Sequence, residues 1–112
     1  MALYRVGPLP GGALAASARF HAEVLPRILA RLDAPRAEEL VILFEPADHT
    51  HRAWRLAAVQ QLAREQAPVR VNAVESDDEA AIAAALVYLG KAKGVTGQLL
   101  PLDGTGAHKI LS

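Results

Sequence analysis

The segment Glu39–Phe44 contains five consecutive apolar residues, Leu-Val-Ile-Leu-Phe, and such a run is typical of a parallel strand buried on both faces. Other strand-like runs cover residues 2–6, 69–74 and 95–102, and helical spacing of apolar residues fills 13–32, 50–66 and 77–89. This strict alternation predicts an α/β fold with a four-stranded parallel sheet and three crossover helices. We expect one domain over residues 1–112.

The first helical segment carries an apolar stripe at three- and four-residue steps, and Pro26 within it predicts a kink or break. Phe20 and Val24 add a second apolar edge, which either completes the core or marks an association surface. In the next helical segment we favour Trp54 as an exposed contact anchor, because other apolar residues already define the sheet-facing side. The predicted stripe of the first segment is Leu14, Ala18, His21, Leu25, Ile28 and Leu32.

Two polar segments look like helix starts. Asp48 or Thr50 is suited to cap the helix over residues 50–66, and Ser76–Glu79 has the Ser-x-x-Glu pattern of a capping box.

Composition excludes several classes of protein. The chain has 112 residues, of which 52% are hydrophobic, so it is not intrinsically disordered. A formal net charge of +0 argues against a dedicated nucleic-acid binder, and the absence of Cys excludes disulfide scaffolds, thiolate metal sites and cysteine nucleophiles. No secretory signal or membrane-spanning stretch is apparent, so we expect a cytoplasmic protein with neither nucleic acid nor membrane as a partner.

Two blocks of sequence resemble the short-chain dehydrogenase/reductase family. His51–Asn72 is similar to the family helix that follows the catalytic Lys and runs into a strand written I-R-V-N. Ala80–Gly104 is similar to the family's C-terminal end, through Val95-Thr96-Gly97-Gln98 and Leu102-Asp103-Gly104. The resemblance covers most of the chain but only the second half of the family's Rossmann fold. It implies a left-handed last crossover, with the third helix on the opposite face of the sheet.

The resemblance also allows the family's catalytic positions to be tested. The Tyr-x-x-x-Lys pair falls on Asp48 and Arg52, the Ser falls near Glu45, and the Asn falls near Ala13. None of these residues is retained, and we expect Asp48 and Arg52 to form an ion pair. The family's Gly-x-x-x-Gly-x-Gly turn is missing, and the prolines of Gly7–Gly12 remove donors that a phosphate needs. We therefore expect no catalytic residues, no cofactor and no enzyme activity.

A polar loop follows the apolar strand, where open α/β sheets place ligands. It contains Glu45, Asp48, His49, His51 and Arg52. The His-x-His spacing with a carboxylate is one way to hold a metal, whereas capping and solvated loop residues are the simpler interpretation, and we expect no metal.

The function predicted from these observations is a non-catalytic, homo-oligomeric structural or interaction module, a dimer or tetramer. In the family, the helices matching 13–32 and 50–66 form a four-helix contact between subunits. The expected reason for association is that one helix cannot cover the opposite face of four strands, and that the first strand is an unpaired edge. The alternatives are an accessory subunit that docks on a full-length dehydrogenase-like partner, and a small-ligand or metal binder that uses the Glu45–Arg52 loop.

Overall fold

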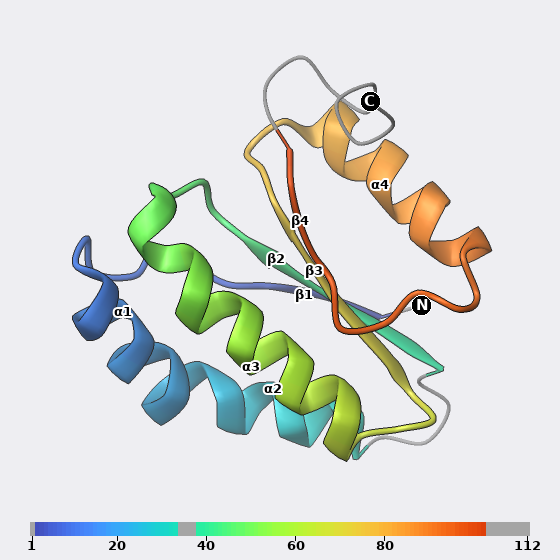
Figure 1. Cartoon of the computed structure of the whole chain (residues 1–112), viewed down its shortest axis with the longest axis horizontal. Coiled ribbons are helices and arrows are strands. Elements are labelled where there is room, and N and C mark those ends of the chain that lie inside the picture. The colour runs from blue at the N-terminus through green and yellow to red at the C-terminus, as the bar shows by residue number, and fades with distance from the viewer. Residues whose placement is uncertain (1, 34–37, 103–112) are drawn as a thin grey trace.

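The computed structural model describes residues 2–33 and 38–102. Four parallel strands form one sheet in the order β1-β2-β3-β4, with helices between them, so the predicted α/β fold is confirmed (Figure 1). No helix in these two ranges is long and apolar enough to cross a membrane. In chain order the elements are β1 (Ala2–Arg5), α1 (Ala13–Arg19), the π-helical turn η1 (Phe20–Val24), α2 (Leu25–Leu32), β2 (Glu39–Phe44), the 3-10 turn η2 (His49–His51), α3 (Arg52–Glu65), β3 (Arg70–Glu75), α4 (Glu79–Lys91) and β4 (Leu99–Pro101).

The sheet lies between two helical layers. The α1–η1–α2 segment and α3 cover one face, and α4 covers the other (Figure 1). Alternate residues of β2 serve the two layers: Leu40, Ile42 and Phe44 belong to the core under α1–α3, whereas Val41 and Leu43 pack with α4. Each connection leads to the next strand in the same direction, but α4 crosses on the opposite face. The last crossover therefore has the opposite hand to the first two, as the resemblance implies.

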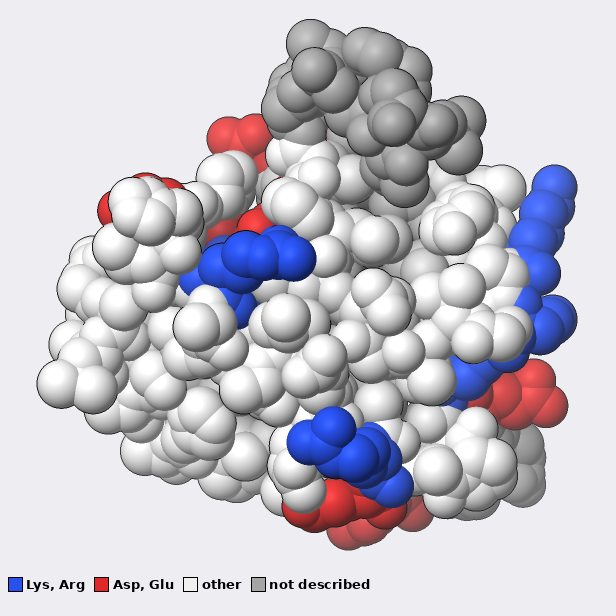
Figure 2. Space-filling view, viewed as in Figure 1, with Lys and Arg blue, Asp and Glu red and all other residues white. Residues whose placement is uncertain are grey.

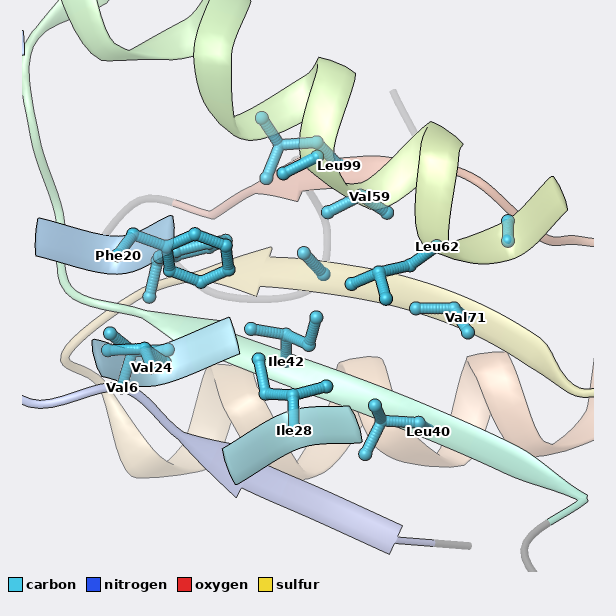
Figure 3. Close-up of a cluster of buried hydrophobic side chains, with 14 residues drawn as sticks. Val6, Phe20, Val24, Ile28, Leu40, Ile42, Val59, Leu62, Val71 and Leu99 are labelled. Atoms are coloured by element: carbon cyan, nitrogen blue, oxygen red, sulfur yellow. The ribbon is translucent and has the colours of Figure 1, made fainter. Parts of the chain in front are cut away.

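The larger core contains Phe20, Val24 and Ile28, which point from the first helical segment toward the sheet (Figure 3). Phe20 and Ile28 are fully buried and Val24 is 8% exposed, so these side chains are core residues. The prediction that Phe20 and Val24 mark an association surface is wrong. The predicted stripe is wrong at its start as well, because Leu14 is 87% exposed.

The π-helical turn explains this change of phase. It closes an i→i+5 hydrogen bond from the Leu25 N–H to the Phe20 carbonyl, immediately before Pro26. A π-turn uses more residues per turn than an α-helix, so residues four apart stay on one side through it. Pro26 therefore sits at a break in the regular helix, as its missing N–H predicts.

The opposite face of the sheet is not bare. Val41, Leu43 and Val74 are buried in a cluster with apolar residues of α4: Ala81, Ile82, Ala85 and Leu89. Leu3, on β1, is only partly buried at the margin of the same cluster. The single helix α4 thus buries the side chains of β2 and β3 on this face, and the incompletely covered part is the margin at β1.

Aspartates cap two helical segments. Asp48 precedes η2 and accepts from the Thr50 N–H at 2.9 Å, which confirms one of the two predicted caps. Asp78 precedes α4 and accepts from the N–H groups of Ala80 and Ala81. The predicted capping box is therefore wrong, and Ser76 instead accepts from the Asp78 N–H, which fixes the turn before the cap.

The two blocks that carry the family resemblance meet at β3. The fully buried amide of Asn72 donates to the Val95 carbonyl and accepts from the Gln98 N–H, both at 3.0 Å. Gly97, with φ at +77°, donates from its N–H to the Val71 carbonyl at 2.7 Å. This loop geometry shortens β4 to Leu99–Pro101, against the predicted 95–102. Asp103 and Gly104, the end of the second block, lie outside the described residues.

Candidate functional site

A cavity of about 200 Å³ opens at the carboxyl ends of β1 and β2, between the loops that follow these strands. This is the end at which open α/β sheets place ligands. Leu9, Gly11, Phe44 and Pro46 line it, together with the polar residues Glu45, Asp48, His51 and Arg55. The structure thus brings three of the five predicted loop residues together at one cavity. The other two, His49 and Arg52, are exposed and do not line it.

The side chain of Asp48 serves as the N-cap of η2. Its carboxylate accepts from both the N–H and the hydroxyl of Thr50, and these two hydrogen bonds hold the pKa of Asp48 below its usual value. Within residues 2–33 and 38–102 no ion pair joins Asp48 to Arg52, so the predicted pair is wrong. The reason is local: the backbone and hydroxyl of Thr50, two residues along the chain, already engage the carboxylate.

Both nitrogens of His51 have partners. Its ring is 4% exposed, with Nε2 at 2.8 Å from the Gly11 carbonyl and Nδ1 at 3.2 Å from the indole Nε1 of Trp54. An indole N–H can only donate, so Nδ1 accepts and Nε2 carries the hydrogen that it donates to Gly11. A metal at either nitrogen would need one of these bonds to break. Nor do any three His, Asp or Glu side chains of the described chain converge as a set of metal ligands.

Trp54 does not project outward as predicted. Its half-buried ring packs beside Phe20 and Phe44, with ring centroids 5.3 and 5.7 Å away. The indole is therefore at the margin of the core, directly behind His51. The prediction failed because Trp54 is anchored by these aromatic rings and by one polar partner, neither of which helical spacing shows.

The polar group that sequence reasoning missed is a buried ion pair. Nη1 of Arg55 donates to Glu75 Oε2 at 2.7 Å and to the Glu45 carbonyl at 2.9 Å, and the two charged side chains are 4% and 13% exposed. The guanidinium also lies 4.5 Å from the centre of the Phe44 ring. This pair links α3 to the carboxyl ends of β2 and β3. A signal was present in the sequence, because Arg55 shares the buried side of α3 with Val59 and Leu62.

The geometry can position groups, but it offers few free ones. Asp48, His51 and Arg55 are held by Thr50, Trp54 and Glu75 respectively. One donor stands out: Nε of Arg55 is buried and has no hydrogen-bond partner among the groups that the structure describes.

Comparison with known proteins identifies a family. A family model described as "SDR-like: Short chain dehydrogenase-like protein" matches residues 4–102. No curated protein and no solved structure matches the chain. The match spans all of the elements from α1 to β4, and it includes the Asn72–Gln98 contact between the two resembling blocks. The chain therefore belongs to the SDR-like family of short chain dehydrogenase-like proteins.

Proposed function

We propose that this chain is a non-catalytic member of the SDR-like family and acts as a self-associating interaction module. The observation that carries the proposal is that Asp48 serves as a helix cap at the position where the resemblance places the family's catalytic Tyr. General acid–base catalysis needs a group that exchanges its proton near the working pH. Asp48 has a lowered pKa and is held by Thr50, so near neutral pH it stays ionised and serves as a helix cap.

The neighbouring positions support the same interpretation. Arg52 stands where the resemblance places the family's Lys, but its side chain is exposed and is directed neither to Asp48 nor to the cavity. Glu75 and Ser76 replace the Pro-Gly pair that follows the equivalent strand in the family, and Glu75 is tied to Arg55. Arg52 therefore faces solvent, and Glu75 has a structural partner in Arg55.

One surface suited to association is a groove between α2 and α3. It has a volume of about 140 Å³, and its walls contain the apolar residues Leu25, Leu29, Ala58 and Leu62. In the family the equivalent helices form the contact between subunits, so the resemblance favours this groove. In the view of Figure 2, charged side chains gather in a few separate groups and uncharged atoms cover most of the face.

Two measurements on the purified chain test the proposal. Light scattering is expected to give two or four times the chain mass, and calorimetric titration with NAD or NADP is expected to give no binding heat. A cofactor-dependent oxidation or reduction that is lost in Asp48→Asn would overturn the non-catalytic part. A monomer at all concentrations up to about 1 mM, the weak end of specific affinity, would overturn self-association.

A second candidate function is favoured by the unpartnered Nε of Arg55. Arg55 lines the 200 Å³ cavity, and a small carboxylate bound there would supply the missing acceptor once the side chain turns its buried Nε toward the cavity. Acetate, a small carboxylate, is the probe. The ring of Trp54 lies 5.6 Å from the Arg55 guanidinium, so tryptophan fluorescence is the readout. Saturable quenching that disappears in Arg55→Lys, which keeps the charge and lacks Nε, would support a ligand binder. A response that is linear in acetate, or equal in both proteins, would reject it.

A further inference from the structure

The two edges of the sheet differ in their capacity to accept another strand. At β1, the Val6 N–H donates to the Leu43 carbonyl on β2. Because backbone groups alternate in direction along a strand, Tyr4 and Ala2 also face β2, whereas the N–H and C=O groups of Leu3 and Arg5 point away from the sheet. No strand occupies that side among the described residues, so β1 offers two donors and two acceptors at a free edge.

The β4 edge is blunted. On its inner side the Gln98 carbonyl accepts from Ala73 and the Leu102 N–H donates to Glu75. By the same alternation, Leu99 and Pro101 face outward, and Pro101 has no N–H to donate. A proline at the outward position is one of the devices by which proteins protect a sheet edge from further pairing. β1 has no proline, so the unprotected edge is β1.

At β1 the side chains of both hydrophobic layers are only partly buried. Ala2 and Tyr4 pack at the margin of the core under α1–α3, and Leu3 packs at the margin of the core under α4, all three remaining partly exposed. A further strand beside β1 would extend both layers at once. The single charge on the edge, Arg5, is already paired with Glu79 through two hydrogen bonds of 3.1 Å.

We propose that β1 of a second copy pairs antiparallel with this edge, giving a two-fold dimer with one continuous eight-stranded sheet. The inference rests on the proposed self-association and assigns it a further surface, separate from the groove between α2 and α3. In the register that uses every outward group of the strand, Leu3 of each copy faces Arg5 of the other, which forms four hydrogen bonds with Tyr4 opposite Tyr4 between them. Shifting the two-fold axis to Arg5 would set two arginines opposite each other, a destabilising pair of like charges.

Pairing of β1 with β1 of a second copy gives a closed dimer. Two copies that use the same edge are related by a two-fold axis, and no edge of the same kind is left over. Pairing of β1 with β4 of another copy would instead be open-ended, and it would place Pro101 against donors and acceptors that it cannot match. The blunted β4 edge therefore favours the two-fold arrangement.

Arg5→Pro and Arg5→Ala form a matched pair of tests. Both remove the ion pair with Glu79, but only the proline removes the outward N–H, and the inward hydrogen bonds of Tyr4 and Val6 stay intact. By light scattering, we expect Arg5→Ala to keep the mass of the unchanged chain and Arg5→Pro to halve it. An Arg5→Pro protein that is folded by circular dichroism and keeps the full mass would overturn the edge pairing, while self-association itself would stand.

Cross-linking gives a test that does not depend on Arg5→Pro folding. The chain has no Cys, and opposite residues in a non-hydrogen-bonded antiparallel pair have Cα atoms about 4.5 Å apart, within disulfide range. Under mild oxidation we expect Tyr4→Cys to convert fully to a disulfide-linked dimer, and Leu14→Cys, on the exposed side of α1, to link at least tenfold more slowly. An associated Tyr4→Cys chain that fails to cross-link would place the interface elsewhere. A monomeric chain would overturn both this inference and the proposed self-association.

Discussion

The indole Nε1 of Trp54 donates to Nδ1 of His51 at 3.2 Å, and through that bond it fixes which nitrogen of the imidazole carries the hydrogen. His51 Nε2 then donates to the Gly11 carbonyl, immediately before the N-cap of α1. The imidazole thus ties the loop after β1 to the start of α3, across forty residues of chain.

This bridge predicts the effect of replacing His51. His51→Ala removes the hydrogen bonds to the Gly11 carbonyl and the Trp54 indole, so we expect a loss of about 0.5–1.5 kcal/mol per bond in the free energy of unfolding. His51→Gln offers an amide that donates and accepts, and it should recover part of the loss. Urea unfolding followed by circular dichroism measures both. Equal losses in the two variants would mean that the ring's packing, and not its hydrogen bonds, is what matters.

The Arg55–Glu75 pair predicts strong coupling between the two positions. Removing one partner leaves a buried charge unpaired, so Arg55→Met and Glu75→Leu are each expected to cost about 3–5 kcal/mol. The double variant should be more stable than the sum of the two losses predicts, because it leaves no charge behind. A double-mutant cycle in urea measures the coupling, and additive losses would show that the pair does not act as a unit.

The phase of the first helix predicts that Phe20 and Leu14 respond very differently. Phe20→Ala creates a cavity under α1–α3 and should cost about 3–5 kcal/mol. Leu14→Ala, on the exposed side of the same helix, should change stability by less than about 0.5 kcal/mol. Thermal unfolding of the two variants compares them directly. A larger loss at Leu14 would restore the stripe predicted from sequence.

The Arg5–Glu79 pair predicts a pH dependence with a definite sign. Hydrogen bonding to Arg5 lowers the pKa of Glu79, so the pair stabilises the folded chain above the carboxyl's unfolded pKa, and this contribution is lost as pH falls through the folded pKa. The unchanged chain should therefore exceed Glu79→Gln in urea midpoint at neutral pH, and the difference should vanish toward about pH 2. Because the pair is exposed, added salt should also shrink the difference at neutral pH. A difference that grows on acidification would contradict the assignment.

The order of elements and the central strand β2 were predictable, because local patterns encode them. β2 matches its predicted bounds at Glu39–Phe44, since a fully apolar run has only one compatible environment in such a chain. The face of the first helix was not predictable, because a π-turn changes the phase of the periodicity without changing composition. Leu14 and Ala16 are thus exchanged between surface and core relative to the simple helical pattern.

The candidate site was predictable in place but not in detail. The loop from Glu45 to Arg52 lies at the end of β2, and Glu45, Asp48 and His51 do line the cavity. Arg55 and Glu75 are twenty residues apart on different elements, so no local pattern joins them. The available signal was that Arg55 lies on the buried side of α3, because a buried charge needs a partner.

The monotonic order β1-β2-β3-β4 has a consequence for how the molecule is assembled. Each strand can be added at the edge of the sheet formed by the strands before it in sequence, and none has to be inserted between two neighbours already paired. The final crossover has the opposite hand and places α4 on the other face of the sheet, but β4 is still added beside β3. The sheet can therefore form in the direction of translation, with β4 and its outward-facing Pro101 added last as the final edge strand.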